Sequence, residues 1–319
     1  MQVSVVVCTY AMERYEAFTE TVESVLAQTY DPLEVVLVVD GNDAVYERVQ
    51  ADFCDAENVV CHNNDENRGI SYSRTKGAEL AAGEVVAMID DDAVAHDDWI
   101  ENLVAVYEET DAVAVGGDVR PDWQTEKPDF FPAEFYWLVG CVEPGFAADG
   151  EEIRNGYGSN ISFRRDVFLE AGGYDTHTGR RGDKHIQAHE APVCIRIREL
   201  TGKGVIYTDG AVVDHKLFDY RGDFDWLVAR SFWQGYSKRV MSLLYPDEDG
   251  DETDYLRLLF LDRVPRRVKG LWTKPSAAAV LQILAIVVFT GAVGLGYLYA
   301  LLTPGLLEKV QTVDEADDA

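Results

Sequence analysis

The apolar run at residues 85–89 constrains the fold of this chain most, because three aspartates (Asp90, Asp91 and Asp92) follow it at once. A short apolar run between a glycine and a charge cluster predicts a β-strand buried on both faces. In an open α/β sheet, ligands bind outside the carboxyl ends of the strands, and these aspartates lie at such an end. Adjacent carboxylates repel unless a cation lies among them. The triplet therefore predicts a Mg²⁺ or Mn²⁺ site; the alternative is an acidic loop or cap of the next helix.

Strands and helices alternate along the first 118 residues. Apolar runs predict strands over 3–7, 33–39, 58–62, 85–89 and 112–115, and apolar spacing predicts helices over 13–29, 67–82 and 97–109. Alternation with short connections is typical of βαβ units and a mostly parallel sheet. This alternation of strands and helices stops after Gly117. Residues 122–145, which are rich in aromatics and prolines, predict a lid or an insertion that faces an acceptor.

The next hundred residues predict fewer elements. They predict a strand over 156–165, a helix that begins near 188–190, two strands over 204–207 and 211–215, and an amphipathic helix over 224–244.

The charge of the chain excludes one class of partner. It has 28 basic and 57 acidic residues, a formal net charge of −29, which is the wrong sign for nucleic-acid binding. Acid spread along the whole chain resembles proteins of salt-loving organisms, since a Debye length near 3 Å at about 1 M salt removes most self-repulsion. The five cysteines lack a CxxC pair. They predict a reducing compartment and argue against a disulfide framework or a zinc ribbon.

The C-terminal region predicts membrane attachment. Residues 276–303 carry no charge and exceed the roughly 20 residues that span a bilayer, so they predict a transmembrane helix. Five basic residues precede this stretch (Arg263, Arg266, Arg267, Lys269 and Lys274), and the tail 304–319 is mainly acidic. The positive-inside rule then predicts a single-pass protein of the cell membrane with a cytoplasmic N-terminal domain. Residues 246–275 form an acidic linker and a juxtamembrane segment. Its part 255–272 is either a membrane-surface helix or a plain helical stalk.

Several motifs, in order and spacing, resemble family 2 glycosyltransferases, which are inverting enzymes with the GT-A nucleotide-diphospho-sugar transferase fold. The motifs are Val5–Tyr10, Val39–Asp43, Asn67–Gly69 and Ile89–Asp92, with Asn160–Arg165 and Gly172–Asp175 similar to the family's acceptor-side segment. The resemblance covers about residues 1–245. It implies a GT-A domain there, an α/β fold with a Rossmann-like nucleotide-binding half (1–118) and an acceptor half (119–245).

A finer resemblance concerns the substrates. The single C-terminal span, the acidic composition and residues 234–239 are similar to those of transferases from halophilic archaea that build lipid-linked N-glycans. Among these, the chain most resembles hexuronic acid transferases that act on dolichol phosphate-linked sugars. This resemblance implies a role in protein glycosylation, with a UDP-sugar donor and a polyprenyl phosphate-linked acceptor.

A sugar nucleotide needs a stacking surface, hydrogen-bond acceptors and a cation. The residues that we predict to bind the donor are Thr9, Tyr10, Asp40, Arg74, Asp90 and Asp91. Asp92 completes a DxD pair and is predicted to hold the metal against the diphosphate. A surface salt bridge is the alternative for Arg74, and turn or cap chemistry is the alternative for Asp40.

Inversion at the anomeric carbon needs a general base that takes the proton of the acceptor hydroxyl. The resemblance places the family's acidic pair at His189 and Glu190, and Glu190 falls on the position of the base. The chain departs from the family here, with Glu for the usual Asp and an adjoining His. A helix cap is the alternative for Glu190, and Asp183 or Asp175 are other candidates for the base.

The remaining predicted site residues face the metal or the acceptor. His215 resembles a histidine that closes GT-A sites and would contact the metal or the diphosphate, or it serves as a structural hydrogen-bonding group. Asn160, Arg180, Arg181 and Lys184 are predicted to contact the acceptor or a phosphate, while the alternative for the three basic residues is pairing with nearby carboxylates.

Together these features predict a membrane-tethered, metal-dependent hexosyltransferase, whose tether raises its effective concentration near a lipid-borne acceptor. Two alternatives remain open at this point. One is a processive polysaccharide synthase of the cell surface, and the other is a membrane scaffold that kept the fold without turnover.

Overall fold

The structure is a computed structural model that describes residues 1–176, 190–246 and 252–306. Within them the chain forms two compact units. Unit 1 comprises residues 1–122, 140–176 and 190–216, and unit 2 comprises residues 123–139, 217–246 and 252–306. This division differs from the predicted one, because the aromatic-rich segment 123–139 joins the C-terminal helices. The predicted domain boundaries remain a prediction.

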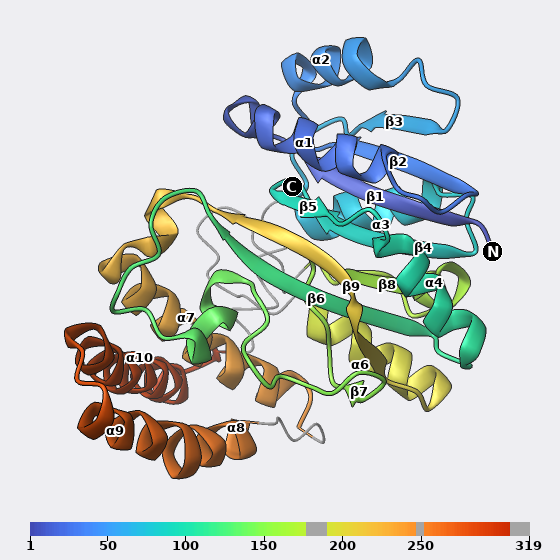
Figure 1. Ribbon diagram of the computed structural model, residues 1–319. Coiled ribbons are helices and arrows are strands. Elements are labelled where there is room, and N and C mark those ends of the chain that lie inside the picture. Colours follow the sequence, from blue (N-terminus) through green and yellow to red (C-terminus); the bar gives the residue numbers. More distant parts are fainter. Residues whose placement is uncertain (177–189, 247–251, 307–319) are drawn as a thin grey trace. The chain divides into compact units, whose positions relative to one another are not determined.

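The first half of the sheet in unit 1 is parallel (Figure 1). Strands β1 (Val3–Thr9), β2 (Leu33–Val39), β3 (Val59–Asn63) and β4 (Val85–Asp90) lie in the order β3-β2-β1-β4. Helices α1 (Tyr15–Leu26), α2 (Asp43–Phe53) and α3 (Ile70–Leu80) connect them, with the 3-10 turn η1 (Met12–Arg14) before α1. Every residue of β1 is buried, as expected for a strand covered on both faces. The Rossmann-like first half is thereby confirmed.

The second half of the sheet is antiparallel. Strand β8 (Ile161–Arg164) pairs with β4 and with β6 (Ala114–Trp123), and β5 (Ala93–Ala95) and β7 (Glu152–Ile153) pair with β9 (Val205–Leu217). The sheet is therefore mixed, and the expectation of a mostly parallel sheet holds only for β1 to β4. The two strands predicted over 204–207 and 211–215 are one continuous strand, β9.

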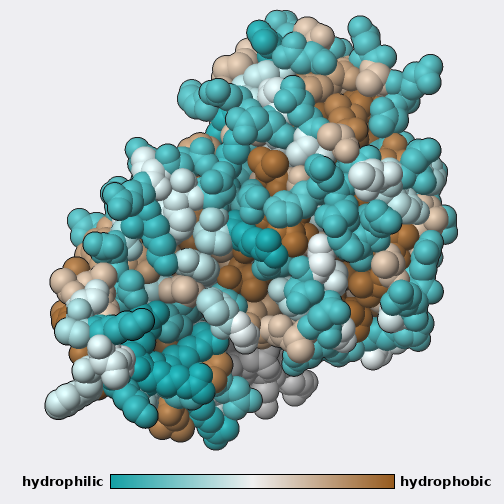
Figure 2. Space-filling view, viewed as in Figure 1, coloured by the Kyte–Doolittle hydropathy of each residue, from teal (hydrophilic) through white to brown (hydrophobic). Residues whose placement is uncertain are grey.

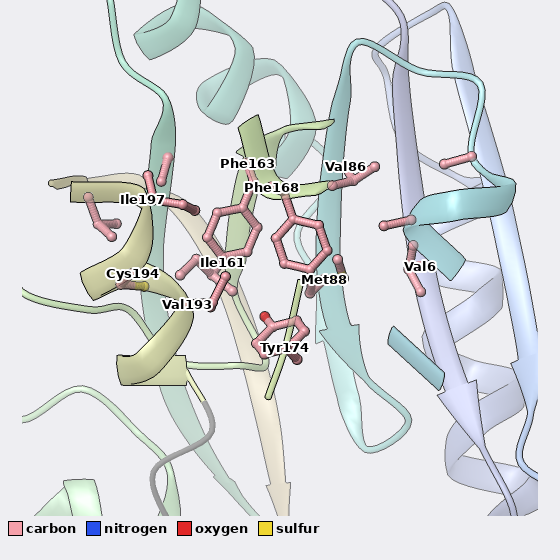
Figure 3. Packing of buried hydrophobic residues seen from close by; sticks show 14 of the residues in the cluster. Val6, Val86, Met88, Ile161, Phe163, Phe168, Tyr174, Val193, Cys194 and Ile197 are labelled. Carbon is pink, nitrogen blue, oxygen red and sulfur yellow. The ribbon is translucent and has the colours of Figure 1, made fainter. Parts of the chain in front are cut away.

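An apolar cluster fixes β4 and β8 in unit 1 (Figure 3). Phe163 of β8 and Phe168 of α5 (Arg165–Glu170) stack with ring centroids 5.0 Å apart, and Met88 of β4 lies in the same cluster. Val193 and Ile197 of α6 (Glu190–Thr201) close it. Full burial of one such side chain stabilises the fold by about 1.5–3 kcal/mol. The cluster thus gives the carboxyl end of β4 and the start of α6 a rigid support.

The sequence argued against a disulfide framework, and the described residues contain one disulfide. A disulfide joins Cys54, just after α2, to Cys61 in β3. The two cysteines are seven residues apart in the sequence, and an odd total number of cysteines does not exclude one such pair. Their Cα atoms lie 6.0 Å apart, within the range that a disulfide bridges. Cys8, Cys141 and Cys194 are buried thiols.

Unit 2 is helical in its described part. It contains the 3-10 segments η2 (Ala133–Val139) and η3 (Asp219–Gly222), helix α7 (Phe224–Leu244), helix α8 (Glu252–Leu258), the π-helical turn η4 (Leu259–Arg263), and helices α9 (Val264–Thr273) and α10 (Ala277–Leu301). Of the described helices, α10 is the one long and apolar enough to cross a membrane, which confirms the predicted apolar C-terminal helix.

Helices α7 and α10 touch backbone to backbone. A Cβ on Gly235 of α7 would lie 1.9 Å from the carbonyl oxygen of Val293, and a Cβ on Gly296 of α10 would lie 1.8 Å from that of Phe232. Real Cβ atoms do not approach so closely, so both glycines are needed for this contact. Residue 235 belongs to the segment 234–239 that stood out in the sequence, and the structure gives it a packing role.

Candidate active site

The acidic triplet lies where strand β4 ends, beside strand β9. The register of β5 and β9 pairs Ala93 with His215, and the Lys216 N–H donates to the Asp92 carbonyl oxygen at 2.8 Å. This pairing brings the His215 ring to the triplet, with Nε2 3.2 Å from Asp92 Oδ1. Pairing between two strands whose partners Ala93 and His215 are 122 residues apart in the sequence therefore builds the site.

Among the described residues, Asp90, Asp92 and His215 form a group that can hold a metal ion, with one ligand atom from each within 4.8 Å of the others. Asp92 and His215 are buried and Asp90 is half-buried. Two carboxylates and one imidazole match the ligand preferences of divalent ions such as Mn²⁺. The structure thus brings together the DxD pair and the histidine that the sequence singled out.

Arg14 was missed by the sequence analysis. Its NH1 lies 3.3 Å from Asp91 Oδ1 and 3.2 Å from Asp92 Oδ2, so one guanidinium partly offsets two carboxylates. Arg14 ends the turn η1, soon after β1. Arg14 follows strand β1, which pairs with β4, and this position was the feature of the sequence that could have indicated a role at the site.

Asp91 faces the protein interior. The Thr9 hydroxyl donates to its Oδ2 at 2.9 Å. Burial, followed by the charge of Asp92, raises the pKa of Asp91 to about 6, while Arg14 and Thr9 oppose this shift. Thr9 and Asp91 were predicted to bind the donor, and the structure shows them bound to each other at the carboxyl ends of β1 and β4.

Arg74 joins the metal-binding group to the candidate base. Its NH2 donates to Asp90 Oδ1 at 2.5 Å and to the Gly158 carbonyl oxygen at 2.9 Å. Its NH1 lies 3.9 Å from Glu190 Oε1. Only 2% of the side chain is exposed, so a surface salt bridge is ruled out. Burial alone would lower the pKa of Arg74, but the charges of Asp90, Tyr174 and Glu190 raise it above its ordinary value.

A glycine makes this approach possible. A Cβ at position 158 would lie 2.2 Å from Glu190 Oε1 and 2.6 Å from Arg74 NH1. Any side chain there would push the carboxylate and the guanidinium apart. Gly158 lies within the predicted strand 156–165, in which the sequence analysis had singled out Asn160 alone as a site residue.

Glu190 is the first residue of α6 and is half-buried. It lies in the first turn of the helix, which is favourable for a carboxylate, and also beside Arg74, so its roles as cap and as base are compatible. The predicted residues His189, Asp183, Arg180, Arg181 and Lys184 lie outside the described residues. The described residues therefore do not test whether Glu190 is the base, and this role stays a prediction.

Asp40 makes contacts typical of a turn. Its carboxylate accepts from Asn64 Nδ2 at 2.8 Å and from the backbone N–H groups of Arg68 at 2.9 Å and Gly69 at 2.8 Å. These bonds hold the loop before α3, where Gly69 has a φ of 86°. The turn alternative thus describes what the carboxylate does in the structure, and its contact with a base stays a prediction.

Asn160 is buried in the fold, whereas Tyr10 is exposed. The Asn160 side chain is completely buried; it accepts from Trp99 Nε1 at 2.8 Å and donates to the carbonyl oxygens of Asp118 and Ala211, both at 2.8 Å. It holds neighbouring strands together, and its predicted contact with the acceptor stays a prediction. Tyr10 is 54% exposed at the end of β1, with a ring surface open for stacking.

Comparisons with known proteins agree with this geometry. Residues 4–172 match the sequence model of the family described as "Glycosyl transferase family 2". The chain is 69% identical over 310 residues to a protein of Haloferax volcanii named "Glucosyl-dolichyl phosphate glucuronosyltransferase", covering 97% of this chain and 99% of that protein. It is 26% identical to the glycosyltransferase GlyG of Streptococcus pneumoniae, covering 82% and 85% of the two chains.

Solved structures share the fold. A mannosyltransferase of Pyrobaculum calidifontis, solved with GDP-Man and Mn²⁺, matches with a TM-score of 0.59 at 18% identity, covering 94% of this chain and 87% of that one. TarS of S. aureus, solved with UDP-GlcNAc, matches with a TM-score of 0.54 at 15% identity, covering 92% and 82%. Both likenesses concern the arrangement of the elements.

Proposed function

The chain belongs to glycosyl transferase family 2, and from this premise we propose that it transfers a hexuronic acid from a UDP-linked donor to a sugar on dolichyl phosphate. The chain is a glycosyltransferase of the GT-A fold that depends on a divalent metal ion. The 69% identity to the Haloferax glucuronosyltransferase over nearly the whole of both chains is the observation that carries the choice of donor and acceptor.

The chain's own residues supply the parts of the reaction. Asp90, Asp92 and His215 would hold Mg²⁺ or Mn²⁺, which when bound neutralises charge on the donor diphosphate. The acceptor hydroxyl oxygen attacks the anomeric carbon while the bond from that carbon to the diphosphate oxygen breaks. The Glu190 carboxylate takes the hydroxyl proton. Arg74 donates a hydrogen bond to Asp90 and lies close to Glu190, so it holds these two carboxylates in fixed positions relative to each other.

Membrane attachment serves the same reaction. An acceptor carried on a lipid stays at the bilayer, and an enzyme held there meets it at a raised effective concentration. The apolar helix α10 supports this attachment. If α10 crosses the membrane, the basic residues before it support a catalytic domain on the cytoplasmic side.

The direct test is transfer to a synthetic glucosyl polyprenyl phosphate. We expect the full chain with Mn²⁺ to transfer glucuronic acid from UDP-glucuronic acid and to reject UDP-glucose, as followed by mass spectrometry of the lipid product. Cells that lack the chain should accumulate a lipid-linked glycan shorter by one hexuronic acid. A product that grows by repeated transfer would instead support the polysaccharide synthase, and no transfer from any UDP-sugar would support the scaffold.

A further inference from the structure

Helix α10 has two faces that run along its whole length. Its buried face consists of Ala285, Ile286, Phe289, Ala292, Gly296 and Ala300. Its opposite face exposes large apolar side chains from one end to the other, among them Val280, Leu284, Val287, Leu295, Leu298 and Leu302 at the C-cap. A lone membrane span is in contact with lipid on all sides. This helix instead lies lengthwise on the rest of unit 2.

Exposed carboxylates lie beside the middle of α10. Helix α7 begins there, and the rings of Phe224 and Phe289 are 5.9 Å apart. Asp223 and Asp225 flank Phe224 and are both exposed. If α10 crossed a bilayer along its own axis, these two aspartates would lie near mid-depth in hydrocarbon. A charge at that depth is among the costliest placements in a membrane.

Polar groups also lie beside both ends of the helix. Near the start, Gln282 accepts from Arg267 NH1 at 2.5 Å and donates to the Asp129 carbonyl oxygen at 2.8 Å. Arg267 also forms an ion pair with Glu134 at 2.6 Å. Near the end, the Arg239 guanidinium lies 6.0 Å from the ring of Tyr297. Polar groups therefore lie beside the start, the middle and the end of α10, which a helix surrounded by lipid would not tolerate.

The helices before α10 combine apolar and basic side chains. Leu261 is 77% exposed and Trp272 is 87% exposed. Between residues 257 and 274 there are six basic residues and one acidic residue, in a chain with a net charge of −29. Figure 2 shows hydrophobic side chains bordering strongly hydrophilic ones over these helices, at the lower left. Such a surface complements an anionic lipid bilayer, because apolar groups enter the acyl boundary and cations meet the headgroups.

We propose that unit 2 binds the membrane in plane: α10 lies along the bilayer surface with its exposed apolar face in the acyl chains, and basic side chains such as Arg266, Lys269 and Lys274 contact anionic headgroups. The chain then does not cross the membrane, and its acidic C-terminal tail stays on the side of the catalytic unit. This replaces the single-pass arrangement expected from the sequence. It does not depend on the donor, the acceptor or the base proposed above.

Sidedness of the tail decides between the two arrangements. We would place one cysteine in the tail (Ala316→Cys) and one on the surface of unit 1 (Glu170→Cys) in the full chain, and treat intact cells and inverted membrane vesicles with a membrane-impermeant maleimide. The unchanged chain gives the background of the native cysteines. We expect both variants to be labelled from the same side of the membrane. Labelling from opposite sides would show a spanning helix and overturn the proposal.

Binding to vesicles maps the face. We expect the double variant Leu284→Glu/Leu298→Glu to lose at least tenfold in affinity for vesicles of phosphatidylglycerol and phosphatidylcholine, and the unchanged chain to bind pure phosphatidylcholine vesicles more weakly. Leu200→Glu in unit 1, a residue with similar exposure, is the matched control and should bind normally. Binding of UDP with Mn²⁺ confirms that each variant is folded, and it reports separately on the proposed donor site.

Two results would contradict the proposal that unit 2 binds the membrane in plane. One is equal vesicle binding by the double variant and the control. The other is a chain that stays off vesicles but forms a dimer, which the double variant abolishes. That result would identify a second copy as the partner of this face.

Discussion

The two units each contain a buried cluster of charged side chains, and the clusters differ in their balance. In unit 1, Asp90, Asp91 and Asp92 face two guanidinium groups, those of Arg14 and Arg74, and Glu190 adds a fourth carboxylate. In unit 2, Glu134 pairs with Arg267 in a two-point contact, with distances of 2.7 and 2.6 Å, and the charge of Arg263 also acts on it. The first cluster has an excess of negative charge, whereas in the second the carboxylate is matched by its arginine partner. A buried excess is favourable only if a cation completes it, so the imbalance marks the functional site, whereas the matched pair serves the fold.

Removing one carboxylate from the first cluster gives the largest expected effect. We expect Asp92→Asn to reduce the transfer rate by about 10⁴-fold, because a metal ligand is worth several kcal/mol of transition-state stabilisation. The same variant should be as stable as the unchanged chain in metal-free buffer, or more stable, because it removes like-charge repulsion. Transfer kinetics and thermal melting measure both. Asp43→Asn, at a carboxylate that accepts from Asn63 away from the cluster, is the control, and an equal loss there would contradict the assignment.

The candidate base comes next. We expect Glu190→Gln to slow transfer by about 10³-fold, within the range for the loss of a general base. Binding of UDP should change little, because Gln keeps the size of the side chain beside Gly158 and Arg74. Single-turnover rates with saturating donor, together with calorimetric binding of UDP, separate the two. A variant that transfers at the normal rate would remove Glu190 from the mechanism.

The matched pair should show the reverse pattern. We expect Glu134→Gln to lose about 3 kcal/mol of unfolding free energy, the lower end for breaking a buried pair, since Arg267 is partly exposed. Its transfer rate should stay close to normal. The double variant Glu134→Gln/Arg267→Gln should recover part of the loss, because no uncompensated charge remains buried. Urea unfolding measures these differences, and equal losses in the single and double variants would contradict the pairing.

The same pair predicts the sign of a pH effect. Burial would raise the pKa of Glu134, but the hydrogen bonds from Arg267, a backbone hydrogen bond and the charges of Arg267 and Arg263 together hold this pKa below its ordinary value. A group with a lowered folded-state pKa stabilises the fold above its unfolded-state pKa and ceases to do so as the pH falls through the folded-state pKa. The unchanged chain should therefore lose this contribution at acid pH below the usual range of a glutamate. Glu134→Gln should lack that part of the acid dependence.

The sequence predicted the acidic triplet and its strand because both are local patterns, an apolar run followed by charge. It also placed the start of α6 within two residues, and it found His215 through a resemblance. Arg14, Gly158 and the pairing of Arg74 with Asp90 depend on strands that meet across the sheet, and no local pattern encodes that meeting. Asn160 and Asp40 show a second limit of local patterns. The structure shows that their hydrogen bonds hold strands and a loop, which the sequence did not predict for Asn160, and their predicted contacts with substrates stay predictions.

The smallest expected effect comes from adding a metal ion to the unchanged chain, which tests the excess of negative charge in the first cluster directly. In the unchanged chain, adding Mn²⁺ with UDP should raise the melting temperature, since a ligand at about 100 times its dissociation constant stabilises a fold by about 2.7 kcal/mol. Chelation should reverse the shift. Asp92→Asn should show little of it, whereas Glu134→Gln should show it in full from a lower starting temperature, because its altered pair lies in unit 2. A shift of equal size in Asp92→Asn and the unchanged chain would mean that the ion binds elsewhere, and the unbalanced cluster would then need another explanation.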